Sequence, residues 1–235
     1  MPIMTGRAMM GNIMVNGMMN EGLSLEIIYS FVIILASLMI YYGTKELYEL
    51  SGHKGIKYFR QAFLYFALAY FFRSSIKFAL RYFNVMAVFD IDPRSINSII
   101  GQTTLFLYIY LSTMAIFYLL LSVKYKQWKN ESVMFLQTLA VIVGIISVIY
   151  NNPLSHLVIN LGLLVVVVGV VILSKSGKKN NLQIIYILLL LFWVLNVLDV
   201  MIPGFFRTFQ LIIYLASSGI FMTMLYRVLR NTGGK

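Results

Sequence analysis

Seven stretches of mainly apolar residues, separated by short polar segments, run along the chain. A transmembrane helix needs about 20 such residues, and the segments between the stretches carry the Gly, Pro and Asn residues typical of turns. Pro93, Pro153 and Pro203 all fall in these segments, so no predicted span is interrupted by proline. The predicted spans are Leu25–Tyr42, Ile56–Ala79, Ser98–Val123, Ser132–Tyr150, Leu157–Ser174, Leu182–Ile202 and Phe209–Leu229.

Two of these spans have alternative interpretations. The first apolar stretch could instead belong to a signal peptide, which needs a short apolar region followed by a small-residue cleavage site. Residues 27–42 instead end in the bulky pair Tyr41-Tyr42 and run into Lys45 and Glu46, which favours a retained helix. The fourth and fifth spans are separated only by Asn151, Asn152 and Pro153. Two asparagines followed by proline favour a turn over one long helix.

Composition supports a membrane protein. Of the 235 residues, 60% are hydrophobic and 11% are charged, and the mean hydropathy is +0.84. A soluble domain carries about 25% charged residues, so this chain could not hide its apolar surface in water. We predict an all-α, polytopic integral membrane protein with a seven-helix transmembrane domain at residues 25–229. A Met-rich, disordered external tail is expected at residues 1–24, and a short cytoplasmic tail at residues 230–235.

Positive charge is concentrated in alternate connecting segments. The first, third and fifth loops and the C-terminus, with the adjoining helix ends, hold 13 of the 19 Lys and Arg residues but three of the eight Asp and Glu residues. Positively charged loops stay in the cytoplasm, so the N-terminus is predicted to lie outside and the C-terminus inside. The net charge of +11 then lies mainly at the inner boundary, where anionic lipid headgroups attract it, and no binding to nucleic acid is expected.

Polar side chains recur at one depth near the outer ends of five predicted spans. A helix rises about 1.5 Å per residue, so Arg73 lies about 20 Å and Lys77 about 26 Å above Arg60 at the inner edge of the second span. Such groups are costly in hydrocarbon, and we expect them to turn inward and meet. The candidate ligand-binding residues are Arg73, Lys77, Gln102, Asn160, Asn196, Asp199 and Gln210.

This polar layer has two main interpretations. In the structural one, interhelical hydrogen bonds and an ion pair of Asp199 with Arg73 or Lys77 hold the bundle together. In the functional one, the layer lines an outward-facing pocket, and its surplus of cations over Asp199 favours a polar or anionic ligand. A third interpretation is that Arg73 and Lys77 extend to the lipid headgroups. The inner halves of the fifth and sixth spans are almost entirely apolar, which favours sensing over permeation.

Several chemistries lack the residues that they require. The chain has no cysteine, and its two histidines, His53 and His156, are predicted on opposite sides of the membrane, so no metal site is expected. The N-terminal methionines could bind Cu(I), but a disordered tail is favoured. No hydrolase motif is present, and no enzymatic activity is expected. The spans resemble those of microbial rhodopsins in number and orientation, but Phe209–Leu229 holds no lysine that could carry retinal, so no cofactor is expected.

These observations predict a receptor-like or sensory protein of the cell membrane that binds a small polar or anionic ligand from outside. The alternatives are a transporter or channel for a small solute or ion, and an assembly subunit of a membrane complex. The expected partners are the lipid bilayer, the ligand, and either another membrane protein or further copies of the chain. The cytoplasmic loops are too short to hold an enzyme, so a receptor would need such a partner for its output.

Overall fold

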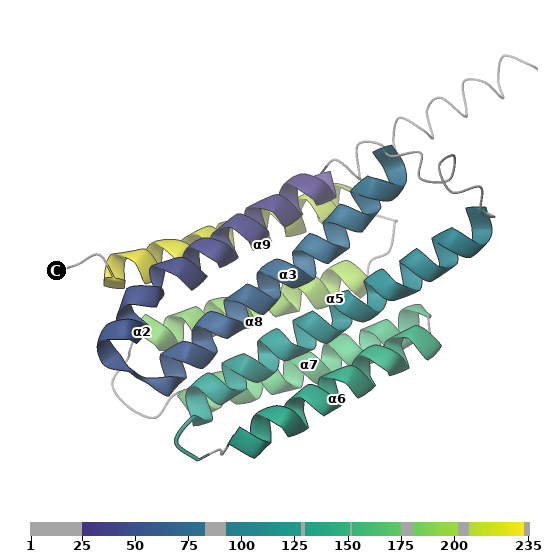
Figure 1. Cartoon of the computed structure of the whole chain (residues 1–235). Helices are drawn as coiled ribbons and strands as arrows, with labels where there is room; N and C mark the ends of the chain where they lie inside the picture. The colour runs from purple at the N-terminus through teal and green to yellow at the C-terminus, as the bar shows by residue number, and fades with distance from the viewer. Residues whose placement is uncertain are drawn as a thin grey trace, which may run out of the picture.

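The computed structural model describes residues 25–82, 93–127, 130–150, 152–174, 181–201 and 207–232. The predicted N-terminal tail at 1–24 and the last three residues lie outside these ranges. Every described element is helical, which confirms the all-α prediction. The elements are a first helix at residues 25–43, α2 (Lys45–Ser51), α3 (Lys54–Tyr82), α5 (Pro93–Lys124), α6 (Asn130–Ile149), α7 (Pro153–Ser174), α8 (Asn181–Met201) and α9 (Arg207–Thr232) (Figure 1).

Five helical segments within the described ranges are long and apolar enough to cross a membrane. They are Leu25–Ser51, Ile99–Lys124, Ser132–Ile149, Leu154–Ser174 and Phe209–Arg230. Helix α3 is long enough, at 29 residues, but Arg60 and Arg73 leave an apolar stretch of only about 20 Å between them. The apolar stretch of α8, Gln183–Asp199, is shorter than the others. Five candidate spans are therefore confirmed, and the count of seven remains a prediction.

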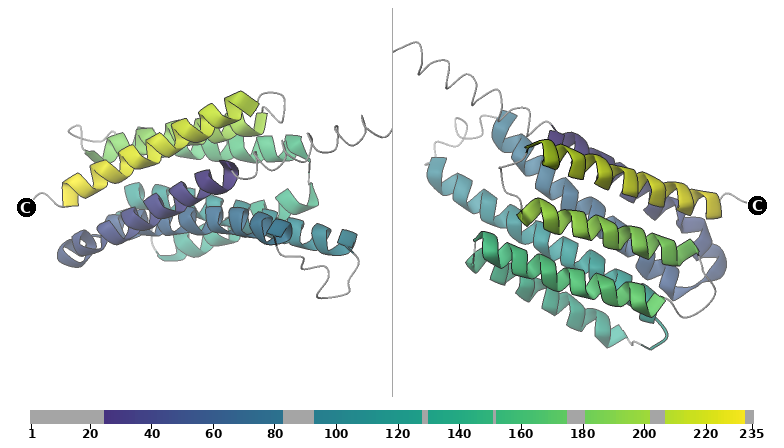
Figure 2. Two further views of the ribbon diagram at one scale, coloured as in Figure 1. Left: turned by 90° about the horizontal axis from the view of Figure 1, so that it is seen from above. Right: turned by 180° about the vertical axis from the view of Figure 1, so that it is seen from behind.

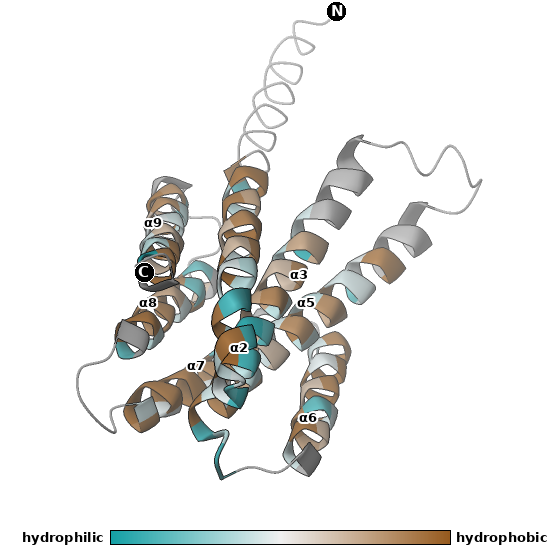
Figure 3. Ribbon diagram, turned by 60° about the vertical axis from the view of Figure 1, so that its left-hand side comes forward, coloured by the Kyte–Doolittle hydropathy of each residue, from teal (hydrophilic) through white to brown (hydrophobic). Residues whose placement is uncertain are grey.

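The helices run side by side as a bundle with α5 at its centre. Helix α5 packs against α3, α6 and α7, and α8 packs against α7 and α9. Seen from above, α8 and α9 lie over a layer that contains the first helix, α3 and α5 (Figure 2). Large apolar side chains such as Met134, Leu154 and Val165 are exposed on the outer surface. Hydrophobic residues dominate the long helices, as expected of a surface that faces lipid, whereas hydrophilic residues are concentrated at α2 (Figure 3).

The predicted first turn contains a helix, α2, that the turn residues did not indicate. Its sequence is built mainly from good helix formers, and Lys45 and Glu49 pair across one helical turn at 3.7 Å. Helix α2 ends at Gly52, whose φ of 62° lies in the left-handed region that favours glycine, and whose N–H donates to the Tyr48 carbonyl at 2.8 Å. The chain turns into α3 at Gly52 and His53, within the segment Ser51–Gly55 whose glycines predict a turn, but a short helix precedes that turn. We call this end of the bundle the α2 end.

The predicted turn between the fourth and fifth spans is confirmed. Helix α6 ends at Ile149 and α7 begins at Pro153, a first-turn position where the missing N–H of proline leaves no hydrogen bond unmade. The Asn152 side-chain oxygen accepts a hydrogen bond from the Ser155 N–H at 2.7 Å and so caps α7. This cap and the proline explain why the segment forms two helices instead of one long helix.

Replacing Asn152 with alanine should lower the free energy of unfolding by about 1 kcal/mol, because the Ser155 N–H loses its acceptor. Denaturant titration in detergent, followed by circular dichroism, would measure the change. Asn152→Asp keeps a side-chain acceptor at the same place and should retain most of the stability. Equal losses for the alanine and aspartate variants would show that the cap does not stabilise α7.

Candidate functional site

One arginine joins four helices near the end of the bundle opposite α2. The Arg73 Nε on α3 donates to Glu26 Oε1 on the first helix at 2.9 Å, and its Nη1 donates to the Tyr108 hydroxyl on α5 at 3.2 Å. Its Nη2 lies 3.8 Å from Asp199 Oδ2 on α8. The side chains of Arg73, Glu26 and Asp199 are 18%, 14% and 12% exposed. The expected pairing of Asp199 with Arg73 is therefore found, with Glu26 as a second and closer partner.

A chain of hydrogen-bonded side chains lies one turn deeper in the bundle. The Tyr70 hydroxyl on α3 donates to the Asn196 side-chain oxygen on α8 at 3.2 Å. The Tyr29 and Tyr70 hydroxyls are 3.2 Å apart, and the Tyr29 ring stacks on Tyr214 of α9 with ring centroids 4.6 Å apart. Tyr29, Tyr70 and Asn196 are buried. Because Tyr70 donates its proton to Asn196, Tyr29 is the donor to Tyr70.

We call the connected side chains of these two layers the Arg73 network. Its members are contributed by the first helix, α3, α5, α8 and α9, so it joins both layers of the bundle seen in Figure 2. It consists of Glu26, Tyr29, Tyr70, Arg73, Tyr108, Asn196, Asp199 and Tyr214.

Phenylalanine rings close the space directly beneath the network. Phe66 precedes Tyr70 on α3 by four residues, and Phe192 precedes Asn196 on α8 by four, so both lie one turn deeper. The Phe192 centroid lies 4.7 Å from that of Phe221 on α9, and the Phe66 centroid is 6.3 Å from each. These three rings and Phe63 are at most 1% exposed. We call Phe63, Phe66, Phe192 and Phe221 the phenylalanine floor.

Of the seven candidate residues, the structure brings together Arg73, Asn196 and Asp199. Asn160 is buried close by, since its carbonyl accepts a hydrogen bond from the Trp193 indole at 3.1 Å. Its side chain nevertheless donates to the His156 carbonyl of its own helix at 2.8 Å, away from the network. The side chain of Lys77 lies outside the described part of the structure.

The two glutamine candidates do not join the network. Gln102 is exposed and lines a groove of about 310 Å³ between α5 and α6, with Phe106 and Ile145 among the other lining residues. This groove lies on a different side of α5 from Tyr108, because Tyr108 faces α3. Gln210 on α9 is partly buried, and no described contact joins it to the network. Residues predicted at the same depth in the bundle therefore do not all point toward the same site.

The sequence interpretation also missed members of the network. Glu26 was grouped with the outer loops and the nearby helix ends, although it rises about 22 Å above Tyr41, close to the height of about 20 Å of Arg73 above Arg60. Tyr70 was interpreted as an ordinary packing residue. With Glu26 included, the described network holds two carboxylates around one guanidinium, so the expected surplus of positive charge is not found among its described side chains.

Comparison of the chain with protein-family models, with curated proteins and with solved structures finds no match. The role of the Arg73 network must therefore be argued from its own geometry. A guanidinium with partners on three other helices can transmit a local change of charge to the packing of all four. The side chain of Arg73 is 18% exposed, so the surrounding protein does not enclose it completely.

Proposed function

We propose that this is a receptor-like or sensory membrane protein that binds a small polar ligand at the Arg73 network. One observation carries the proposal: a partly exposed arginine pairs with carboxylates from two other helices directly above a floor of buried rings. A ligand that competes for Arg73 would alter how the first helix and α8 are held against α3. Ligand binding would thus be coupled to helix packing, as signalling requires.

The charge distribution supports an orientation with the network facing outward. Three described cations lie at helix termini at the α2 end of the bundle, opposite the network: Lys54 begins α3, Lys124 ends α5, and Arg230 lies in the last turn of α9. Because positively charged loops remain in the cytoplasm, we propose that the α2 end is cytoplasmic and the N-terminus external. The ligand would then arrive from outside the cell membrane, with seven crossings as the sequence predicts.

The chemistry of the ligand follows from the two carboxylates. An anionic ligand must displace Glu26 or Asp199 from Arg73, and the 3.8 Å contact with Asp199 is longer than a hydrogen bond and so the easier one to replace. A carboxylate or phosphate on the ligand could form a paired, charge-assisted contact with the guanidinium. Tyr108 and Tyr214, which are only partly buried, would offer hydroxyl groups to the rest of the molecule.

The phenylalanine floor supports binding rather than passage. A solute path needs polar groups along its length, whereas four buried rings lie between the network and the α2 end. The transporter and assembly-subunit alternatives remain proposals with distinct tests. Uptake of a network ligand into proteoliposomes would support a transporter, and a co-purifying membrane protein would support an assembly subunit.

A ligand screen by thermal unfolding tests the proposal. Small carboxylates, phosphates, amines and neutral sugars would be added singly to the purified protein in detergent, and we expect one class to raise the unfolding temperature. Tyr108→Phe removes the hydroxyl that contacts Arg73 and should weaken the apparent affinity about tenfold, a loss of about 1.4 kcal/mol.

Tyr110→Phe is the matched control on the same helix, because the Tyr110 hydroxyl faces Gln137 of α6 instead of the network. It should leave ligand affinity unchanged. The proposal would be wrong if no class stabilises the protein, or if a stabilising compound acts equally on both phenylalanine variants.

A further inference from the structure

A second arginine of α3 is held in place at the α2 end. The Arg60 Nε donates to the Tyr41 carbonyl at the end of the first helix at 3.1 Å. Its guanidinium carbon lies 4.7 Å from the centroid of the Tyr41 ring and 5.7 Å from that of Tyr48. The guanidinium is therefore fixed between the first helix and α2, and its two terminal NH2 groups are not used in these contacts.

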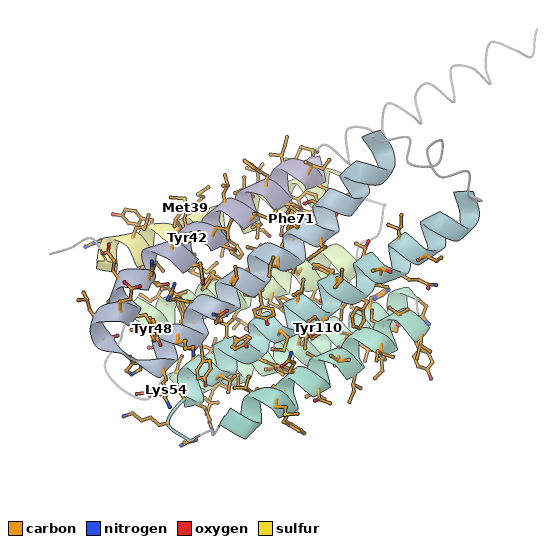
Figure 4. The ribbon with its side chains drawn as sticks, in the orientation of Figure 1. Met39, Tyr42, Tyr48, Lys54, Phe71 and Tyr110 are labelled. Atoms are coloured by element: carbon orange, nitrogen blue, oxygen red, sulfur yellow. The ribbon has the colours of Figure 1, made fainter. Side chains whose placement is uncertain are left out.

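The positive charge of this corner has no acidic partner in the part of the chain that the structure describes. No carboxylate among the described residues lies within 4.0 Å of Arg60, Lys57 or Lys54, whereas Arg73 has two. Lys54 and Lys57 are exposed, and their spacing of three residues places them beside Arg60 on one side of α3. Tyr48 and Lys54 lie together at the α2 end in Figure 4. We call Arg60, Lys57 and Lys54 the Arg60 corner.

An apolar stripe continues from this corner along the same side of α3. Leu64, Leu68 and Phe71 follow Arg60 at spacings of four, four and three residues, and Leu68 and Phe71 are exposed. Phe71 lies farther along α3 from the corner in Figure 4. In α2, Leu50 is 89% exposed, which is expected of a short helix that meets a membrane surface.

We propose that the Arg60 corner binds the phosphate of an anionic phospholipid, whose acyl chains lie along Leu64, Leu68 and Phe71. A fixed guanidinium suits this role because its paired N–H groups match two phosphate oxygens. Lys57 and Lys54 supply the further positive charge that distinguishes an anionic headgroup from a zwitterionic one. The apolar stripe favours a lipid over free phosphate. The headgroup of a lipid would contact the charged Arg60 corner, and its acyl chains would contact the apolar stripe that continues from it.

The full-length protein in detergent would be titrated with phosphatidylglycerol, phosphatidylcholine or inorganic phosphate, and bound lipid counted by native mass spectrometry. Phosphatidylglycerol should be retained in preference to phosphatidylcholine, and inorganic phosphate should not displace it. Arg60→Gln should weaken its retention about tenfold. Lys57→Gln, at an exposed position where folding is not at risk, should weaken it in the same direction.

Arg230→Gln is the matched control, because Arg230 is an exposed cation in the last turn of α9, a helix that carries none of the three corner residues. It should leave retention unchanged. The proposal is overturned if both phospholipids are retained equally, if Arg230→Gln weakens retention as much as Arg60→Gln does, or if inorganic phosphate displaces the lipid. The ligand screen at the Arg73 network uses variants of other residues and measures the unfolding temperature instead of lipid retention, so either proposal can fail without the other.

Discussion

Replacing Arg73 with glutamine should lower the free energy of unfolding by about 3–5 kcal/mol, the loss typical when one partner of a buried ion pair is removed. The variant leaves Glu26 and Asp199, 14% and 12% exposed, without the guanidinium that contacts both. Unfolding in mixed micelles, followed by tryptophan fluorescence, would measure the loss. Lys45→Ala is the control, because its pair with Glu49 is more than half exposed and should contribute less than about 0.5 kcal/mol.

A combined variant separates the charge of the network from its packing. Glu26→Gln, Asp199→Asn and Arg73→Met together leave no buried charge at this site, and should recover most of the stability lost by Arg73→Gln alone. The stability measurement decides the role of the ion pairs in the fold, and ligand binding by the same variant decides their role in function. If the combined variant is no more stable than Arg73→Gln, unpaired carboxylates are not the cause of the loss.

Replacing Phe192 with alanine should give the second-largest loss, about 2–3 kcal/mol. Phe192 is fully buried and contacts rings of α3 and α9, so its removal leaves a cavity in the phenylalanine floor. The loss should fall below the 3–5 kcal/mol seen for Phe→Ala in soluble cores, because the unfolded helix still keeps this side chain in hydrocarbon.

Phe71→Ala provides the comparison on the outer surface, where the ring is 49% exposed. It should change the free energy of unfolding by less than about 0.5 kcal/mol. Phe192→Leu should fall between the two, because leucine refills part of the space. The same micelle unfolding experiment measures all three variants, and similar losses for Phe192→Ala and Phe71→Ala would mean that the floor is not tightly packed.

The helices were predictable because apolar run length and turn residues are local signals. Asn152 and Pro153 divided α6 from α7 as expected, since both act within one turn of their own position. Helix α2 was missed because the apolar run ends at Tyr42, whereas the good helix formers from Lys45 to Leu50 continue the helical conformation without being uniformly apolar. Five of the seven predicted spans are confirmed as candidate spans, whereas α3 carries Arg60 and Arg73 within its length and the apolar stretch of α8 is short, so the count of seven remains a prediction.

The site was only partly predictable, because depth along a helix is readable from sequence but the direction of a side chain is not. Arg73 and Asp199 were found by depth, and Glu26 would have been found had the same calculation been applied to the first helix. Gln102 lies at a suitable depth but faces α6, because the packing of the helices determines how α5 is rotated about its axis. The role of Tyr70 was not predicted because it belongs to a run of aromatic residues in α3, most of them phenylalanines that carry no polar group.

The spacing of the two arginines in α3 has a consequence for the surrounding bilayer. They are about 20 Å apart along the helix, whereas the hydrocarbon layer of an average membrane is about 30 Å thick. Arg60 and Arg73 are each fixed by contacts with the first helix, which limits how far their side chains can extend toward water. A membrane crossed by α3, as the sequence predicts, would therefore have to thin beside this pair of helices, and the mismatch would favour thin membranes with short acyl chains.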